Sequence, residues 1–313
     1  MKVFLIDKVH PILQERLNKN GFECIDATRF SMDELLKRKH DVHGIVLRAR
    51  FLLNSEVLSN FPNLEFIARS GSGMENINVA YCKSHNIKLF NSPEGNRNAV
   101  AEHALGMLLA LMNKLCKANN QISEGVWNRE ENRGEELDGK TLGIIGYGNN
   151  GAAFAKKLRG FDVKVLAYDK YKFGFGDDFV HESTLEAIFN SADVVSLHIP
   201  QNKETIGLVN EAFINSFEKP FYILNLSRGK IIHTESLVKA LESNKIKAAG
   251  LDVLEFESKD FESIFAQQLP EAFQYLLASD RVLLSPHVGG WTKESYFKLS
   301  DVLADKIISY YQH

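Results

Sequence analysis

One stretch, residues 140–169, constrains the fold of this chain more than any other. A short apolar run at 141–145 leads into Gly146-Tyr147-Gly148-Asn149-Asn150-Gly151, a helical pattern follows, and a second apolar run ends at Asp169. Strand, G-x-G-x-x-G, helix, strand and acid in this order form the fingerprint of a dinucleotide-binding βαβ unit. A glycine-rich turn without a ligand would explain a lone G-x-G-x-x-G, but the full context favours a dinucleotide.

Each residue type in the fingerprint has a physical role. Gly146 permits a tight turn, Gly148 lets the backbone approach a pyrophosphate, and Gly151 allows close packing of helix on strand. The new helix presents unpaired N–H groups and the positive end of its dipole to the phosphates. Asp169 is expected to accept hydrogen bonds from the adenosine ribose and to repel a 2′-phosphate. The stretch therefore predicts NAD rather than NADP as the cofactor.

Composition narrows the class of protein. At 313 residues the chain is long enough for two domains, and a net charge of −3 gives no basic surface for nucleic acid or an anionic membrane. The most apolar run, residues 104–112, is too short to span a bilayer. The three cysteines (24, 82 and 116) lie far apart, with no metal-ligand spacing. We expect a cytoplasmic protein without a signal peptide, a membrane span or a bound metal.

The rest of the chain alternates short apolar runs with helical stretches, which predicts parallel sheets covered by helices. Besides the two fingerprint strands, strands are expected at residues 3–7, 22–26, 44–47, 64–68, 87–90, 194–199, 222–226, 249–253 and 282–285. Shorter helices are expected at 11–20 and 32–39, a long helix over 99–121, and a last helix over 293–310.

Turn residues at 91–96 predict a domain boundary, and the last helix is expected to fold back on the first domain. We therefore predict an α/β protein with two doubly wound parallel-sheet domains. The substrate domain, of flavodoxin-like type, covers residues 1–95 and 291–313, and the NAD-binding domain, of Rossmann type, covers 96–290. The default position of the active site is the cleft between them.

Candidate catalytic residues follow three of the later strands, where ligands of such sheets bind. Arg228 can clamp a carboxylate, a carboxylate of the segment 252–257 can orient and charge a histidine, and His287 can act as general acid or base. Taken singly, each has a bland alternative: a surface ion pair, a solvated acidic loop and a structural histidine. Together they are the set that reversible hydride transfer at an alcohol carbon requires.

In the segments that carry these residues, the chain resembles the D-isomer-specific 2-hydroxyacid dehydrogenases. N-L-S-R-G around Arg228, L-D-V-L-E-F-E ending at Glu257 and S-P-H-V-G-G around His287 are similar to the three signatures of that family. The resemblance implies that Arg228 and His287 act on the substrate, that Glu257 pairs with His287, and that subunits dimerise through the NAD-binding domain. Besides the fingerprint glycines and Asp169, it implies NAD contacts from Asn149, Asn150, His198, Pro200, Leu226, Ser227, Asp252, Gly289 and Gly290. It implies substrate contacts from Ser72, Gly73 and Asn96.

Within the family the chain resembles phosphoglycerate dehydrogenases most. Arg48 and Arg50 follow a strand of the first domain and resemble a basic pair near a phosphate, although a solvated edge would also explain them. Arg129 lies in a segment (125–129) similar to one that reaches the partner subunit. The leading expectation is NAD-dependent oxidation of 3-phospho-D-glycerate to 3-phosphohydroxypyruvate, as in serine biosynthesis, by a homodimer. A glyoxylate or hydroxypyruvate reductase, and an NAD-sensing binding protein like the corepressors of this fold, are the alternatives.

Three departures from the family pattern stand out. Ser258 occupies a position where the family often has proline, Glu75 one where aspartate is usual, and Asn149-Asn150 includes a position that is usually a larger apolar residue. Nothing in the sequence resembles the serine-sensing domain of longer phosphoglycerate dehydrogenases, so we expect no serine feedback through such a domain.

Overall fold

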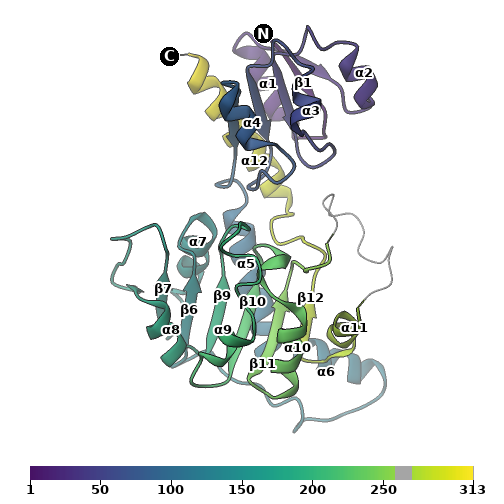
Figure 1. Cartoon of the computed structure of the whole chain (residues 1–313). Helices are drawn as coiled ribbons and strands as arrows, with labels where there is room; N and C mark the ends of the chain where they lie inside the picture. The colour runs from purple at the N-terminus through teal and green to yellow at the C-terminus, as the bar shows by residue number, and fades with distance from the viewer. Residues whose placement is uncertain (258–269, 313) are drawn as a thin grey trace. The chain divides into compact units, whose positions relative to one another are not determined.

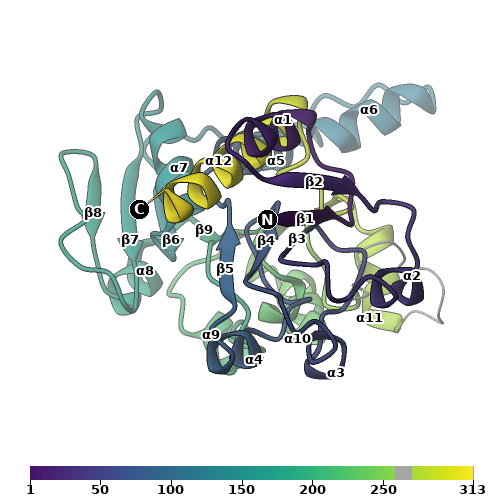
Figure 2. The ribbon, with the colours of Figure 1, turned by 90° about the horizontal axis from the view of Figure 1, so that it is seen from above.

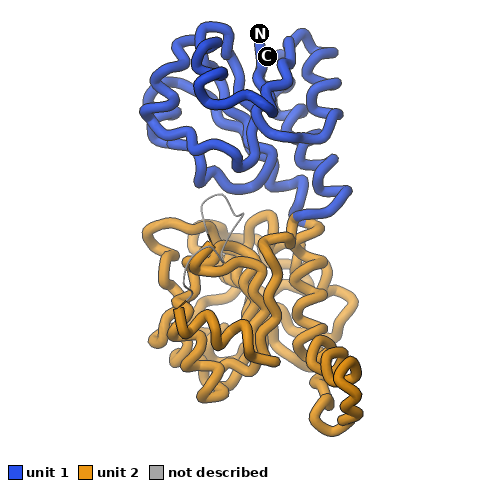
Figure 3. Tube along the Cα trace, turned by 90° about the vertical axis from the view of Figure 1, so that its right-hand side faces the viewer, with its two compact units in different colours: residues 1–97, 259–262, 291–313 blue, residues 98–258, 263–290 orange. Residues whose placement is uncertain are grey.

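The computed structural model of the chain describes residues 1–257 and 270–312, and these residues divide into two units (Figure 3). Unit 1 comprises residues 1–97 and 291–312, and unit 2 comprises residues 98–257 and 270–290. Each unit has its own parallel sheet with helices on both faces. The prediction of an α/β protein with two doubly wound parallel sheets is confirmed.

The sheet of unit 1 has the strand order β2-β1-β3-β4-β5, with every neighbouring pair parallel. Its strands are β1 (Lys2–Leu5), β2 (Glu23–Asp26), β3 (Gly44–Leu47), β4 (Phe66–Arg69) and β5 (Lys88–Asn91). Its helices are α1 (Pro11–Lys19), α2 (Met32–Leu36), α3 (Ser55–Leu58), α4 (Val79–Ser84) and α12 (Lys293–Tyr311). The order reverses direction between β1 and β3, which is the switch point of a flavodoxin-like sheet.

Two apolar clusters bury the two faces of this sheet. One cluster joins the sheet to side chains of α2, α3 and α4, and the other joins it to α1 and α12. The helices α1 and α12 lie side by side although their sequences are far apart (Figure 2). Arg16 of α1 is paired with Asp301 of α12 at 2.7 Å, and Lys306 of α12 with Glu94 at 2.8 Å. The last helix therefore belongs to unit 1.

The sheet of unit 2 has the order β12-β11-β10-β9-β6-β7-β8, again with parallel neighbours throughout (Figure 1). Its strands are β6 (Thr141–Ile145), β7 (Lys164–Tyr168), β8 (Val180–Glu182), β9 (Val194–Leu197), β10 (Phe221–Asn225), β11 (Ile246–Leu251) and β12 (Val282–Leu284). Strand β8, which the sequence did not predict, has only three residues. The order reverses between β6 and β9, where dinucleotides bind in such sheets.

Helices cover both faces of this second sheet. The helices are α5 (Arg97–Met112), α6 (Leu115–Ser123), α7 (Asn149–Leu158), α8 (Leu185–Ser191), α9 (Glu211–Asn215), α10 (Thr234–Glu242) and α11 (Glu271–Ala278). Side chains of α8, α9, α10 and α11 share one apolar cluster with the sheet, and side chains of α5 and α7 share the other. Both faces are buried, which explains why strands such as β9 and β10 are buried at every residue.

The predicted long helix over 99–121 is wrong, because the chain breaks it at Lys114. That residue has a left-handed backbone (φ 51°), which a helix interior does not allow, and α5 and α6 meet at an angle of 60°. The N–H of Glu135 donates to the carbonyl of Met112, the last residue of α5. Taken singly, no helix in the described parts of the chain is long and apolar enough to cross a membrane, whereas the bent pair α5 and α6 together would be.

Candidate active site

The predicted site residues of unit 2 follow the carboxyl ends of six of its strands. Residues of the fingerprint follow β6, Asp169 follows β7, and His198 and Pro200 follow β9. Arg228 follows β10, Asp252 and Glu257 follow β11, and His287 follows β12. Because β10, β11 and β12 are neighbours in the sheet, the three proposed catalytic side chains start from adjacent strands. The expected nucleotide contacts near the fingerprint follow β6, β7 and β9, and the proposed catalytic residues follow β10, β11 and β12, so the boundary between the two sets lies between β9 and β10.

The glycine-rich turn fits a bound dinucleotide. Gly146 has φ 95°, and a Cβ added there would lie 2.5 Å from the carbonyl oxygen of His198. A Cβ on Gly151 would lie 2.1 Å from the carbonyl oxygen of Gly146, so helix and strand approach as closely as only glycine allows. Gly148, the N-cap of α7, has no neighbouring atom within 4 Å of its Cβ position and makes no side-chain capping bond. Open space at Gly148 and an uncapped helix end are what a pyrophosphate requires.

Asp169 organises the loop that follows β7. Its Oδ2 accepts from the N–H of Tyr147 at 2.8 Å, and its Oδ1 accepts from the N–H groups of Tyr171 (2.9 Å) and Lys172 (3.1 Å). The carboxylate is thereby held against the second residue of the glycine-rich turn. A carboxylate oxygen has further lone-pair capacity, so Asp169 can still accept from a ribose hydroxyl.

Two polar atoms beside the glycine-rich turn are buried and have no hydrogen-bond partner in the described part of the chain. They are Nδ1 of His198 and Oδ1 of Asn150. The other ring nitrogen of His198 is 2.8 Å from the hydroxyl of Ser196, and burial lowers the pKa of His198 to about 4. Buried polar atoms normally form hydrogen bonds within the protein, and among the described residues these two atoms do not.

Arg228 is positioned by a close approach of backbone to backbone. A Cβ on the next residue, Gly229, would lie 1.9 Å from the carbonyl oxygen of Leu254, so only glycine lets the turn after β10 reach the loop after β11. Asn225, fully buried, accepts from Ser227 and donates to the carbonyl of Arg228 at 3.0 Å. The Arg228 guanidinium donates to the carbonyl of Ser227 at 2.6 Å. The local sequence N-L-S-R-G thus fixes the base of the arginine side chain.

His287 and Glu257 form an acid–base pair within unit 2. Nδ1 of His287 is 2.9 Å from Oε2 of Glu257, and both side chains are partly buried. The other oxygen of Glu257 accepts from the N–H of Leu254, which holds the carboxylate in place. His287 has a left-handed backbone (φ 55°), and its N–H donates to the carbonyl of Asp252 at 2.8 Å. The structure therefore brings these two predicted residues together.

Asp252 holds the loop that carries His287. Its buried carboxylate accepts from the hydroxyl of Ser285 at 2.6 Å and from the N–H groups of Val288 (2.9 Å) and Gly289 (2.8 Å). His103 of α5 adds a contact to Ser285 at 2.9 Å and lies 3.6 Å from the carboxylate. The sequence analysis did not single out Ser285 or His103. Ser285 directly precedes the P-H-V-G-G motif and could have been found there, whereas nothing in the sequence marks His103.

The remaining predicted NAD contacts occupy the same strand ends. Leu226 and Ser227 are buried directly after β10, Pro200 lies three residues after β9, and Gly289 is buried against Asp252. Gly290 ends the segment of unit 2 that carries His287. Asn149 is the first residue of α7 and is exposed. Ser258 lies outside the described residues.

In unit 1 the structure gathers Ser72, Gly73 and Asn96 around the end of β4. The hydroxyl of Ser72 donates to Oδ1 of Asn96 at 2.9 Å. Arg69, which the sequence analysis did not single out, bridges this loop to the end of β3. Its guanidinium donates to the carbonyl of Arg48 at 2.9 Å and to that of Gly73 at 2.7 Å. The loop after β4 and the segment that carries Arg48 are therefore fixed to each other.

The two arginines after β3 have different environments. The guanidinium of Arg50 donates to the carbonyls of Ile6, Thr28 and Phe30 at 3.1, 2.6 and 2.8 Å, which uses its donors inside the protein. These bonds leave some of the five guanidinium N–H donors of Arg50 unused, so the expectation that Arg50 binds substrate stays a prediction.

Within the described residues, the guanidinium of Arg48 is not held by backbone carbonyls as that of Arg50 is. Its guanidinium carbon lies 4.1 Å from the ring centre of Trp291, and burial lowers the pKa of Arg48. In the described chain its guanidinium makes no hydrogen bond and no ion pair. Arg129 is exposed and lies in the segment after α6, where the described structure brings it to none of the other predicted site residues.

The sequence and the fold of this chain are similar to those of known dehydrogenases. Residues 105–289 match the NAD binding domain of the D-isomer specific 2-hydroxyacid dehydrogenases. A hydroxypyruvate reductase of Thermotoga maritima is 34% identical over 93% of this chain and 92% of that protein. A D-3-phosphoglycerate dehydrogenase of Archaeoglobus fulgidus is 32% identical over 99% of this chain and 57% of that protein, so the chain spans little more than half of that relative. The solved structure of a D-lactate dehydrogenase from Aquifex aeolicus, complexed with NAD and lactic acid, aligns over 100% of this chain and 96% of its own, with a TM-score of 0.82 and 26% identity.

Proposed function

Because the chain belongs to the D-isomer specific 2-hydroxyacid dehydrogenases, a family of NAD-dependent oxidoreductases, we propose that it oxidises 3-phospho-D-glycerate to 3-phosphohydroxypyruvate. The observation that carries the chemical part of this proposal is the His287–Glu257 pair, 2.9 Å apart, beside the strand end that bears Arg228. A histidine oriented by a carboxylate is the usual general base for an alcohol proton.

In the proposed reaction the residues of this chain bind, orient and move one proton. Arg228 holds the substrate carboxylate with charge-assisted N–H bonds. His287 takes the hydroxyl proton at Nε2, because Nδ1 is engaged by Glu257, whose negative charge stabilises the imidazolium that results. NAD would supply the hydride acceptor, and loss of a hydride from the carbon that bears this hydroxyl would leave a ketone. In the reverse direction His287 returns the proton as an acid.

The phosphorylated substrate is supported by Arg48. Burial lowers the pKa of Arg48, and the charge of Asp7 acts in the opposite direction without forming an ion pair with its guanidinium, so a bound anion would offset the desolvation cost further. Its stacking on the ring of Trp291 fixes the plane of the guanidinium, which favours a planar two-bond contact with a phosphate. Lactate or glycerate would leave this charge unused.

A hydroxypyruvate reductase is the second candidate. The observation in its favour is that the Thermotoga maritima relative carries that name and aligns over 92% of its own length. Arg228, Glu257 and His287 would have the same roles in that enzyme, and Arg48 would have no part in catalysis.

The experiment that decides between them measures NADH formation with 3-phospho-D-glycerate and NADH consumption with glyoxylate, hydroxypyruvate and 3-phosphohydroxypyruvate. We expect kcat/KM for the phosphorylated pair to be at least about 10²-fold above the others, roughly 2.7 kcal/mol. Arg48→Met should remove most of this preference, while Arg38→Met, an exposed arginine of the same unit, should leave it unchanged. Equal turnover of the unphosphorylated acids by the wild-type protein would reject the proposal of a phosphorylated substrate and favour the hydroxypyruvate reductase.

We also propose that the protein is a homodimer joined through unit 2. Apolar side chains of α6 and the segment after it are exposed there, namely Leu115, Ile122, Val126 and Trp127. Contiguous exposed apolar groups of this kind usually mark an interface. Arg129 follows directly in this segment and would be carried toward the partner.

A further inference from the structure

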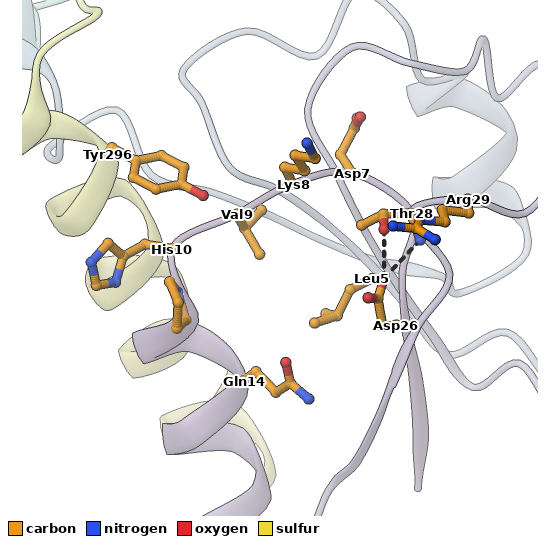
Figure 4. Close-up of a pocket in the computed structure, with 11 residues that line it drawn as sticks. Leu5, Asp7, Lys8, Val9, His10, Gln14, Asp26, Thr28, Arg29 and Tyr296 are labelled. Atoms are coloured by element: carbon orange, nitrogen blue, oxygen red, sulfur yellow. Dashed lines mark hydrogen bonds between the residues drawn. The ribbon is translucent and has the colours of Figure 1, made fainter.

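A pocket of about 670 Å³ opens at the carboxyl ends of β1 and β2 in unit 1 (Figure 4). None of the residues assigned above to substrate, cofactor or catalysis lines this pocket. Its walls come from the segment after β1, the start of α1, the segment after β2, and α12. The lining residues are Leu5, Asp7, Lys8, Val9, His10, Pro11, Gln14, Asp26, Thr28, Arg29 and Tyr296. A volume in this range is typical of small-molecule sites, which are roughly 300–1,000 Å³.

Hydrogen-bond donors without partners line this pocket. Within residues 1–257 and 270–312, the side chains of Lys8 and Arg29 make no hydrogen bond and no ion pair, and the same holds for hydrogen bonds of the Gln14 amide and the Tyr296 hydroxyl. In Figure 4 Lys8 lies at the top of the pocket, Arg29 on one side, Gln14 below, and Tyr296 on the other side. Unused donors therefore come from four directions.

The two acids of the pocket are already engaged. Oδ2 of Asp7 accepts from the N–H groups of Arg48 (2.6 Å), Ala49 (3.0 Å) and Arg50 (3.1 Å). Oδ1 of Asp26 accepts from both the N–H (2.9 Å) and the hydroxyl of Thr28, which lower the pKa of Asp26. The charge of Arg29 also lowers the pKa of Asp26, but in the described chain neither Lys8 nor Arg29 forms an ion pair with either acid. No group of three or more metal-binding side chains occurs in the described chain, so a cation is not the expected occupant.

The walls of the pocket are held in place before any ligand arrives. Arg50 donates to the carbonyls of Ile6 and Thr28, which joins the segments after β1 and β2, and Asp7 joins the segment after β1 to the end of β3. On the opposite wall, the N–H of His10 donates to the hydroxyl of Ser300 at 3.0 Å, and its ring meets that of Tyr296 edge-on at 5.4 Å. A site built on fixed walls loses little entropy on binding.

We propose that this pocket is a second binding site that takes a small organic anion, bearing a phosphate or a carboxylate, between Lys8 and Arg29. Both groups recognise the same anion chemistry through charge-assisted bonds, while Leu5, Val9 and the ring of Tyr296 provide apolar contact for the body of the ligand. The anion is specific to the pocket rather than attracted by overall charge, since the chain carries a net charge of −3.

The test is calorimetric titration of the wild-type protein at low ionic strength with inorganic phosphate and, separately, with succinate. Lys8→Met/Arg29→Met should weaken binding of at least one of these anions by at least about tenfold. Lys19→Met/Lys37→Met removes the same charge from exposed positions of unit 1 and should leave binding unchanged. Arg48→Met should retain the binding event that Lys8→Met/Arg29→Met removes, which separates this pocket from the proposed substrate site.

Selective loss in Lys8→Met/Arg29→Met supports the site, and the anion that binds distinguishes a phosphate from a carboxylate ligand. Loss in Arg48→Met alone would assign the anion to the substrate site and overturn the proposal. So would equal weakening in the Lys19→Met/Lys37→Met control, or the absence of binding to the wild-type protein. Because binding is measured without turnover, inactivity toward 3-phospho-D-glycerate would not affect this result.

Discussion

His287 combines an unusual backbone with the proposed chemistry. A left-handed conformation costs a residue with a side chain roughly 1–2 kcal/mol, and here φ is 55°. Three groups keep it there: Glu257 through the ring, the carbonyl of Asp252 through the N–H, and the bonds that Asp252 makes to Val288 and Gly289. Strained residues held by many bonds cluster at functional sites, so the geometry agrees with the role proposed for His287.

We predict that His287→Ala lowers kcat by about 10²–10⁴-fold while leaving the dissociation constant of NADH unchanged. The ring is lost, but the fingerprint and Asp169 are not touched. Steady-state kinetics and fluorescence titration of NADH measure the two quantities. His181→Ala, which removes an exposed histidine of β8, is the matched control. Normal turnover by His287→Ala would reject the mechanism.

His198 makes stability depend on pH. Burial lowers its pKa in the folded protein from the ordinary 6.5 to about 4, so the unfolded chain binds a proton first as the pH falls. The folded state is therefore favoured fully above pH 6.5, and this contribution, of order 3 kcal/mol, is lost between pH 6.5 and about 4.

The measurement is an NMR titration of the histidine ring signals, with His198→Asn used for assignment. We expect the His198 ring to stay neutral at pH 5.5, where ordinary histidines are charged. The stability difference between wild type and His198→Asn should shrink as the pH is lowered from 7 to 4.5. A His198 midpoint near 6.5 would contradict the effect.

At the scale of elements, the site depends on how closely the turn after β10 approaches the loop after β11. The short 3-10 helix Gly229–Ile231 begins at this contact. The register of β10 and β11 places Asn225 opposite Leu251, so the two strands end together and their following loops meet. Arg228 and Glu257 take their positions from this contact rather than from regular secondary structure.

We predict that Gly229→Ala destabilises the protein by about 1–3 kcal/mol and also lowers kcat, because its Cβ would lie 1.9 Å from the Leu254 carbonyl oxygen. Thermal unfolding and steady-state kinetics measure the two effects. Gly160→Ala, where nothing lies within 4 Å of the Cβ position, is the control. A Gly229→Ala protein as stable and active as Gly160→Ala would show that the backbone contact is not required.

At the scale of the whole molecule, the exposed apolar side chains of α6 and the following segment distinguish unit 2. Trp127 is 79% exposed, and Leu115 and Ile122, seven residues apart, lie on the same face of α6. Several large exposed apolar side chains within one short stretch are typical of an interface.

We predict that Trp127→Asp shifts the protein from dimer to monomer, because a charge is costly in a buried interface. Sedimentation velocity over a range of concentrations measures the change. Tyr171→Asp alters an aromatic residue of unit 2 that is also exposed but lies after β7, and it should leave the dimer intact. A wild-type protein that sediments as a monomer would reject the dimer itself.

The sequence by itself determined the class of fold, the family and the cofactor. These features are local: short continuous apolar runs, glycines at fixed offsets, and polar residues directly after strands, so neighbouring residues alone carry the signal. Strand boundaries moved by only one to three residues, as for β11, where pairing with β10 extends the strand to Ile246.

Tertiary structure decided what depends on partners distant in the sequence. Lys114 breaks the predicted long helix where the chain returns to Met112 through Glu135. The guanidinium of Arg50 donates to carbonyls 20 or more residues away, whereas the guanidinium of Arg48, two positions earlier, lies over the ring of Trp291. Local sequence cannot distinguish the two arginines, because the difference lies entirely in which carbonyls the fold brings within hydrogen-bonding distance.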